Sequence, residues 1–197
     1  RYKNPRKAEW PAADFVVGNP PFIGKTRIRA ALGDGYVEAL RAAWSHVPDS
    51  ADLVMYWWDH AAALTQLGAL RSFGLITTNS MRQAFNRRVV DVRLSEPERM
   101  SLKFVVPDHP WVEASDGAAV RISMTVGVRG NVTGRQLVLV HEVEGSDGTI
   151  DVVLRERSGR IHSDLSVGAN IVGAAQLIAA RRIANTGVIL GGRGFVV

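Results

Sequence analysis

The chain has 197 residues, of which 46% are hydrophobic and 22% charged, so it can bury one substantial core and does not have the composition of a disordered chain. It contains no cysteine, which excludes disulfides, thiolate zinc sites and catalysis by a cysteine nucleophile. The formal charge of +5 suits a polyanionic partner, although a basic excess of this size also serves solubility alone.

The first strand signal is the apolar run 15–17, which stops abruptly at Gly18. A β-branched run that ends at a glycine and two prolines is typical of a buried strand that stops at a sheet edge, because neither proline can donate to a ladder. The next four residues, Asn19-Pro20-Pro21-Phe22, therefore follow the carboxyl end of the strand, where open α/β sheets bind their ligands.

These four residues have a specific chemical use. The carboxamide oxygen of Asn19 and the backbone carbonyl of Pro20 could accept both hydrogens of an exocyclic amino group and draw its conjugated lone pair into a tetrahedral arrangement. The prolines, Pro20 and Pro21, stiffen the loop in advance, and Phe22 offers a ring on which an extruded base can stack. The alternative is an ordinary tight turn, since Gly, Asn and Pro are common turn formers.

A phosphate-binding P-loop is a rival interpretation of the residues that follow, because Gly24-Lys25-Thr26 resembles the end of that motif. The motif requires four residues between its two glycines, whereas five separate Gly18 from Gly24. Two of those five are prolines, which have no amide hydrogen to offer a phosphate. We therefore reject the P-loop.

Strand and helix signals alternate through the middle of the chain, which predicts a mostly parallel sheet with helices on its faces. Apolar periodicity predicts helices over residues 36–44 and 53–67, followed by a buried strand over 74–78. In the second helix, at least one of the adjacent Trp57 and Trp58 should be core. Asn79 follows the strand and should line the same pocket as Asn19, unless its side chain only caps the next turn.

Two further strands are predicted at residues 102–106 and 120–129, the latter in a late antiparallel hairpin. The Pro-rich segment 108–111 between them reads as a loop, and Trp111 is a candidate for stacking on a base. Packing of Trp111 under the hairpin as core is an equal alternative. Beyond these strands we expect a β-hairpin over 135–153 and a short helix over 173–183.

Basic residues follow both loops and could contact phosphates near the site. For any one of them a solvated helix face is at least as good an interpretation. The six candidates are Lys25, Arg27, Arg29, Arg82, Arg87 and Arg88.

Residues 14–129 resemble the catalytic half of a γ-class amino-directed DNA methyltransferase, similar to those in large fused restriction-modification and phage-defence polypeptides. The segments that carry the resemblance are Asn19 to Phe22, ADLVMYWW at 51–58, GLITTNS at 74–80, Pro110-Trp111 and DGAAVR at 116–121.

The resemblance implies an α/β fold that contains the C-terminal half of a Rossmann-like class I methyltransferase sheet, mostly parallel with a late antiparallel hairpin, and a small β-rich tail. Residues 1–130 would form the catalytic half, and 131–197 a hairpin and linker towards a target-recognition domain. The activity implied is adenine-N6 methylation of double-stranded DNA, with Asn19 and Pro20 holding the amino group and Phe22 and Trp111 enclosing the flipped base.

The implied methyl donor is S-adenosylmethionine, and no metal is expected. The family's Gly-rich cofactor loop and its ribose-binding acid are expected upstream of residue 1, since too few residues follow the glycine-rich run 191–195 for it to replace them. The remaining partner would be the rest of the same polypeptide, with an attached nuclease left open. We expect the isolated chain to be inactive.

No apolar run approaches the roughly 18 residues of a membrane span, and no signal-peptide pattern opens the chain. We therefore expect a cytoplasmic protein without a membrane segment.

The absence of cysteine excludes methylation at cytosine carbon 5, which needs a thiolate. Methylation of cytosine N4 or of a protein glutamine, and a non-catalytic DNA- or partner-binding role, stay open as alternatives.

Overall fold

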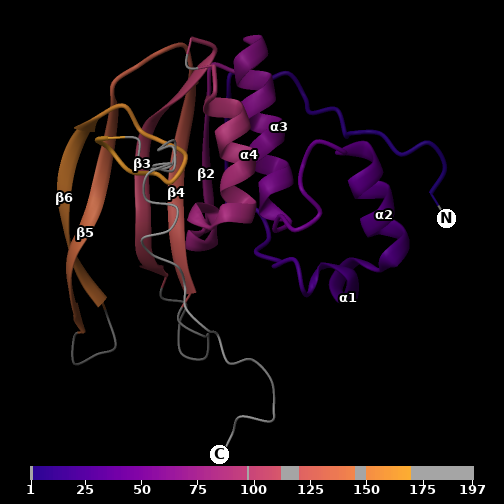
Figure 1. Ribbon diagram of the computed structural model, residues 1–197, viewed down its shortest axis with the longest axis horizontal. Helices are drawn as coiled ribbons and strands as arrows, with labels where there is room; N and C mark the ends of the chain where they lie inside the picture. Colours follow the sequence, from indigo (N-terminus) through magenta and orange to yellow (C-terminus); the bar gives the residue numbers. More distant parts are fainter. Residues whose placement is uncertain (1, 97, 112–119, 145–149, 170–197) are drawn as a thin grey trace, which may run out of the picture.

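The computed structural model describes residues 2–96, 98–111, 120–144 and 150–169 (Figure 1). Within these ranges the chain forms a mixed α/β fold around a six-stranded sheet with the order β1-β2-β4-β3-β5-β6. The strands are β1 (Phe15–Gly18), β2 (Ser72–Thr78), β3 (Met100–Trp111), β4 (Val120–Arg129), β5 (Gly134–Glu144) and β6 (Ile150–Gly159).

Four of the six strands, β1, β2, β3 and β5, run in one direction, as the register of their pairings requires. Strand β4 runs against them and lies between β2 and β3, so the neighbouring pairs β2·β4 and β3·β4 are antiparallel. The late antiparallel hairpin expected from the sequence is therefore present. The prediction of a mostly parallel sheet holds for strand direction but not for neighbouring pairs, because β4 separates two strands that would otherwise pair in parallel.

The described helices are α1 (Ile28–Leu32), α2 (Asp34–Ala43), α3 (Val54–Leu67), the 3-10 helix η1 (Asn79–Arg82) and α4 (Ala84–Leu94). Helices α2 and α3 confirm the two predicted from periodicity, and α3 ends at Gly68, whose φ of 78° gives the left-handed cap that glycine adopts without strain. Helix α4 had not been predicted. No helix in the described ranges is both long and apolar enough to cross a membrane.

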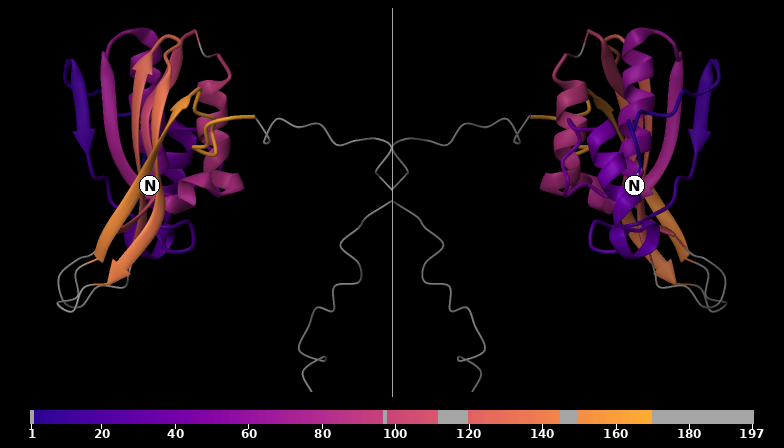
Figure 2. Two further views of the ribbon diagram at one scale, coloured as in Figure 1. Left: turned by 90° about the vertical axis from the view of Figure 1, so that its left-hand side faces the viewer. Right: turned by 90° about the vertical axis from the view of Figure 1, so that its right-hand side faces the viewer.

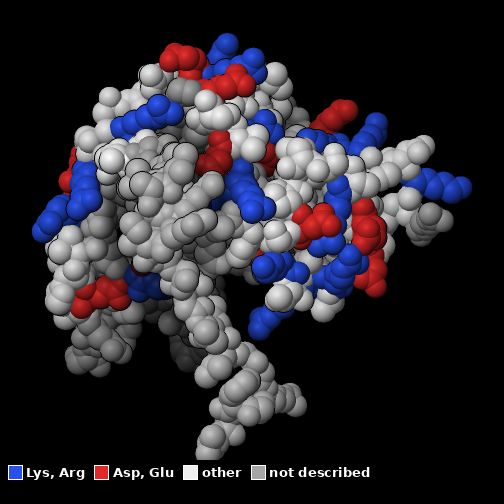
Figure 3. All heavy atoms as spheres, in the orientation of Figure 1, with Lys and Arg blue, Asp and Glu red and all other residues white. Residues whose placement is uncertain are grey.

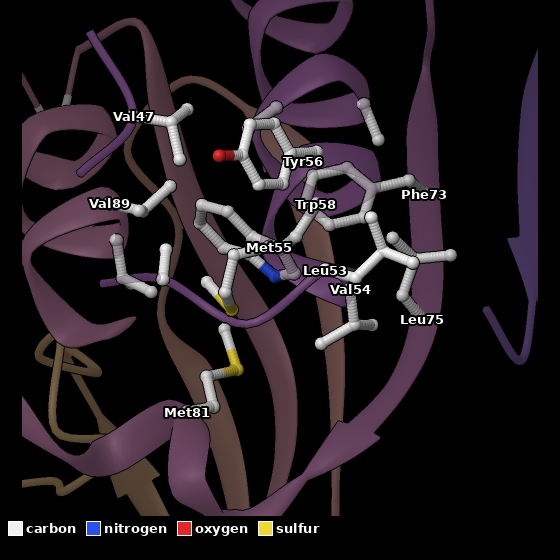
Figure 4. Close-up of a cluster of buried hydrophobic side chains, with 14 of the residues drawn as sticks. Val47, Leu53, Val54, Met55, Tyr56, Trp58, Phe73, Leu75, Met81 and Val89 are labelled. Atoms are coloured by element: carbon white, nitrogen blue, oxygen red, sulfur yellow. The ribbon is translucent and has the colours of Figure 1, made fainter. Parts of the chain in front are cut away.

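Helices α3 and α4 pack on one face of the sheet, and α1 and α2 lie beyond α3 (Figure 1). Trp58 anchors this layer. Its side chain is fully buried, its Nε1 donates to Thr125 Oγ1 at 3.0 Å, and its ring meets Phe73 edge to face at 5.6 Å (Figure 4). Trp57 is half-buried, so the expectation that one of the two tryptophans is core is confirmed.

The predicted hairpin beyond residue 134 is confirmed as β5 and β6, which pair antiparallel. Strand β5 also pairs in parallel with β3, so the hairpin extends the main sheet. After β6 the chain turns back and buries Ile161 and Leu165 in the same core, where Gln136 Nε2 donates to the Leu165 carbonyl at 2.6 Å. The predicted helix at 173–183 and the run 191–195 lie outside the described residues.

Strand β3 carries two irregularities in its pairing with β4. Leu102 pairs with Gly127 and Phe104 with Val126, so β3 has one extra residue there. A second extra residue lies between Val106 and His109. Bulges of this kind let a strand pass a residue that cannot pair, and here Pro107 lies within the second one.

A buried ion-pair cluster joins α3 to α4. Asp59, 1% exposed, accepts from Arg93 Nε at 2.6 Å and from Arg93 Nη2 at 2.9 Å, and His46 Nε2 donates to the same carboxylate at 2.7 Å. Burial alone would raise the pKa of Asp59, but the hydrogen bonds from Arg93 and His46 outweigh it and hold that pKa below its usual value.

We expect Asp59→Asn to lower the free energy of unfolding by about 3 kcal/mol at neutral pH, because it leaves Arg93 without its charged partner. A carboxylate whose folded-state pKa is depressed stabilises the fold above the ordinary value of 3.8, and this stabilisation is lost as the pH falls through the folded-state pKa. Urea unfolding should show the gap between parent and variant narrowing below about pH 4. Asp91→Asn on the exposed face of α4 is the control, and an equal loss there would contradict the assignment.

Candidate functional site

The loops after β1 and β2 lie at one edge of the sheet. The two strands are parallel neighbours in the register Gly18↔Leu75, so their carboxyl ends point the same way. Residues 19–22 leave β1 there, and η1 begins directly after β2. The expectation that Asn19 and Asn79 fall at the same sheet edge is therefore confirmed. Figure 2 shows β1 as the indigo arrow at the outer edge of the sheet.

The second half of the loop after β1 is hydrogen-bonded to the start of α3. Ile23 N donates to the Pro21 carbonyl at 3.1 Å, and the Ile23 carbonyl accepts from Leu53 N at 3.0 Å. The Asn19 side chain is exposed, and the structure gives neither its carboxamide nor the Pro20 carbonyl a hydrogen-bond partner among the described residues. Both acceptors proposed for an amino group are therefore free to receive one.

Asn19 lies in the wall of a cavity of about 420 Å³ on the face of β1, which we call the β1 cavity. Trp57 also lines this cavity, and the described lining contains no carboxylate. The residues that line it are Trp10, Pro11, Ala13, Val16, Val17, Gly18, Asn19, Pro20, Trp57 and Leu75.

Phe22 faces a different cavity of about 330 Å³, which we call the β2-loop cavity. Its wall combines two phenylalanine rings with several hydroxyl, amide and charged groups. The lining residues are Phe22, Ile23, Gly24, Lys25, Thr26, Asp52, Val54, Thr78, Ser80, Gln83 and Phe85. Asn19 and Phe22, although three residues apart, thus line separate cavities.

Asp52, which the sequence analysis had not assigned to the site, is buried beside the β2-loop cavity. Its Oδ1 accepts from Lys25 N at 3.0 Å, and its Oδ2 accepts from Ser80 Oγ at 2.8 Å and from Asn86 Nδ2 at 2.7 Å. The Asp52 amide in turn donates to Asn86 Oδ1 at 2.9 Å. Two sequence signals mark Asp52: it precedes an apolar helix directly, and it lies within the segment 51–58 that carries the family resemblance.

Asn79 does not cap the following turn. Its Nδ2 donates to Asp108 Oδ1 at 3.2 Å, and Arg121 Nε donates to the same oxygen at 2.7 Å. Partial burial alone would raise the pKa of Asp108, but the hydrogen bonds from Arg121 and Asn79 hold it below its usual value. Asn79 therefore ties the loop after β2 to strand β3.

The prediction of a loop over residues 108–111 is wrong, because β3 continues through them to Trp111, which pairs with Val120. The bulge after Val106 explains the difference, since it lets the strand resume beyond Pro107. Trp111 is half-buried and lines neither cavity. The predicted base-stacking residue therefore lies at the end of a strand and shares no cavity lining with Asn19 or Phe22.

The six basic candidates differ in their surroundings. Arg29 pairs with Asp34 at 2.9 Å and with Glu38 at 2.5 Å, and Arg82 Nε donates to the Asp164 carbonyl at 3.2 Å. The ammonium group of Lys25 lies 4.1 Å from the centre of the Phe85 ring. Arg27 and Arg88 are exposed and Arg87 is half-buried. Basic and acidic side chains intermingle over α1 and α2 (Figure 3), so only part of this charge is uncompensated.

Comparisons with known proteins agree with this architecture. Residues 3–140 match a family described as the MmeI DNA-methyltransferase domain. The fold is similar to that of MmeI, a Type IIL restriction-modification enzyme solved in complex with DNA, with a TM-score of 0.59 and 22% identity over 80% of this chain and 20% of that one. The chain thus spans about a fifth of that enzyme. A search of curated proteins finds no match.

Within the described ranges, no group of three or more histidine, aspartate or glutamate side chains is placed to hold a metal ion. The polar groups at the two loops are amides, hydroxyls and single carboxylates spread over several elements. They are suited to hydrogen-bonding a ligand.

We expect Arg27→Gln and Arg29→Gln to differ in their effect on binding to duplex DNA. Arg27 is exposed, so its loss should reduce the slope of log affinity against log salt by about 0.9 if it neutralises one phosphate. Arg29 already pairs with two carboxylates, so its loss should leave the slope nearly unchanged. Fluorescence anisotropy titrations over a range of salt concentrations measure both, and equal slopes in the two variants would contradict the distinction.

Proposed function

Because this chain belongs to the family of MmeI-type DNA-methyltransferase domains, we propose that the polypeptide carrying it transfers a methyl group from S-adenosylmethionine to the N6 amino group of adenine in double-stranded DNA. The enzyme would serve a restriction-modification system. The observation that carries the proposal is a pair of acceptors at the carboxyl end of β1, the Asn19 carboxamide and the Pro20 carbonyl, to which no described residue donates a hydrogen bond.

Methylation of an exocyclic amino group requires two hydrogen-bond acceptors, one for each amino hydrogen. The lone pair of the adenine amino nitrogen is conjugated with the ring, so the amino group is a poor nucleophile. Hydrogen bonds from both amino hydrogens to Asn19 Oδ1 and the Pro20 carbonyl would favour a tetrahedral nitrogen with a localised lone pair. The methylated nitrogen can then lose its proton to water, so no strong base is needed.

The order of the first four strands also supports the proposal. Strands β1 and β2 are parallel, and β4 inserts antiparallel between β2 and β3. This pattern is what we expect of the C-terminal half of a Rossmann-like class I methyltransferase sheet. The loops that carry Asn19 and Asn79 then occupy the edge at which such sheets bind their ligands.

The β1 cavity fits part of S-adenosylmethionine. Its lining is apolar apart from Asn19, with the Trp57 indole as a wall against which a planar ring can lie. Its described lining contains no carboxylate to bind ribose hydroxyls, so these residues can hold only one side of the cofactor. When bound, S-adenosylmethionine supplies an electrophilic methyl group. The contribution of this chain is to place the amino group and to exclude water with the cavity's apolar wall.

The enclosure of the flipped base by Phe22 and Trp111 is part of the proposal. Phe22 is half-buried and lines the β2-loop cavity, where an extruded base could stack on its ring. Because Phe22 and Asn19 line separate cavities, the base would lie between those cavities, with its amino group towards Asn19.

We expect Asn19→Ala in the full-length enzyme to reduce methyl transfer by roughly 100- to 1,000-fold, the usual effect of removing one preorganised hydrogen-bonding group, with little change in DNA affinity. Transfer of a radiolabelled methyl group measures the rate, and mass analysis of nucleosides identifies the product. Asn131→Ala, at an exposed position, is the matched control. Substantial residual activity would contradict the assignment of Asn19, and N4-methylcytosine as the product would contradict that of adenine.

We expect Trp111→Ala to remove the fluorescence gain of 2-aminopurine placed at the target position, because the extruded base would lose its stacking partner. Trp111→Phe keeps an aromatic face and should keep most of the gain. A full gain in the alanine variant would show that Trp111 serves the fold of β3 and not the base.

A further inference from the structure

Three segments that are distant in sequence meet at the carboxylate of Asp52. One donor is the amide of Lys25 in the loop after β1, the second is the hydroxyl of Ser80 in η1, and the third is the side-chain amide of Asn86 in α4. These partners lie 27, 28 and 34 residues from Asp52. Asp52 therefore connects the loop after β1 to η1 and α4.

The chemistry of the site requires a carboxylate. All three partners donate, and an ionised carboxylate is the one side chain that offers only acceptors, on two oxygens. An asparagine in its place would offer one oxygen, and its NH2 group would face donors. Asp52 is 8% exposed, so a donor left without an acceptor here would pay the cost of desolvation.

The connection fixes the two loops that the proposed reaction uses. Lys25 follows Phe22 by three residues, and the backbone bond from Leu53 N to the Ile23 carbonyl secures the same loop. Ser80 adjoins Asn79, and its hydroxyl also lies 2.6 Å from Thr78 Oγ1. These bonds fix the loop after β1 relative to the loop after β2, and residues of both loops line the β2-loop cavity.

We propose that Asp52 is the positioning residue that fixes the Asn19–Phe22 loop against the loop after β2, so that the acceptors for the target amino group are in place before the substrate arrives. The inference rests on the proposed function of Asn19. Preorganisation of this kind matters to the rate, since a displacement of about 1 Å can reduce turnover about 100-fold.

The test uses Asp52→Asn, Asn86→Asp and the double exchange in the full-length enzyme. The single change at position 52 removes an acceptor, whereas the double exchange returns a carboxylate to the cluster at position 86. That carboxylate can accept from the introduced amide, from the backbone amide of residue 52 and from Ser80 Oγ, which lies 3.2 Å from Asn86 Nδ2. In the double exchange, the bond that Asn86 donates to the Ser80 carbonyl has no counterpart, because a carboxylate at position 86 cannot donate.

We expect Asp52→Asn to lower kcat about 100-fold with the KM for DNA nearly unchanged, and the double exchange to recover at least a tenth of the parent kcat. Ser80→Ala removes one of the three bonds to the Asp52 carboxylate and should lower kcat less. This variant tests the same proposal if Asp52→Asn does not fold. Asp49→Asn, three residues away and exposed, is the matched control and should match the parent. A parent-like kcat in both Asp52→Asn and Ser80→Ala would overturn the proposal, as would a loss that the double exchange does not restore.

Hydrogen-deuterium exchange supplies a readout that does not depend on methylation. Peptides that cover residues 20–27 and 78–83 should exchange faster in Asp52→Asn and recover in the double exchange, while peptides from α2 and β5 should not change. If the parent enzyme methylates no DNA, the proposed function fails, and the exchange pattern still decides whether Asp52 holds the two loops. Faster exchange across the whole domain would show a general loss of stability and overturn the positioning role.

Discussion

The parallel pairing of β1 with β2 is the constraint on which the site depends. Strand β1 has four residues, and its one described partner is β2. That pairing alone brings the carboxyl ends of two strands, more than 50 residues apart in sequence, to the same edge of the sheet. Reversing either strand would carry its loop to the opposite edge, and no substitution in the loops themselves could compensate.

The remaining layers keep this pairing in place. The start of α3 is hydrogen-bonded to the loop after β1 through Leu53 N and the Ile23 carbonyl. Helix α3 packs on the sheet through Trp58, which contacts Phe73 in β2 and Thr125 in β4. The Asp59 cluster then joins α3 to α4, which itself follows the loop after β2. Each loop therefore follows a strand of the sheet and contacts a helix that buried side chains hold against it.

The parts of this site that the sequence predicts are those with local causes. The position of β1 and of its loop is marked by Gly18 and two prolines, whose backbone limits hold in any context. The expectation that this strand is buried is wrong, because Phe15 is 59% and Val17 85% exposed at the edge of the sheet. Which of Trp57 and Trp58 faces the sheet depends on the rotation of α3, which only packing decides. Asp52 was missed because its partners come from three separate segments. The segment 108–111 was misread because prolines usually end strands, and the bulge that accommodates Pro107 leaves no mark in the sequence.

The two bulges in β3 have a consequence for how this sequence can change length. Side chains alternate between the faces of a strand, so each extra residue reverses the face on which all later residues lie. Val106 and His109, three positions apart, therefore lie on the same face, and deleting one residue between them would remove the bulge in which Asp108 contacts Asn79. Substitutions along this strand keep the bulge, whereas deletion of a single residue within it would remove it. The number of residues between Val106 and His109 is thus under physical constraint, as well as their identity.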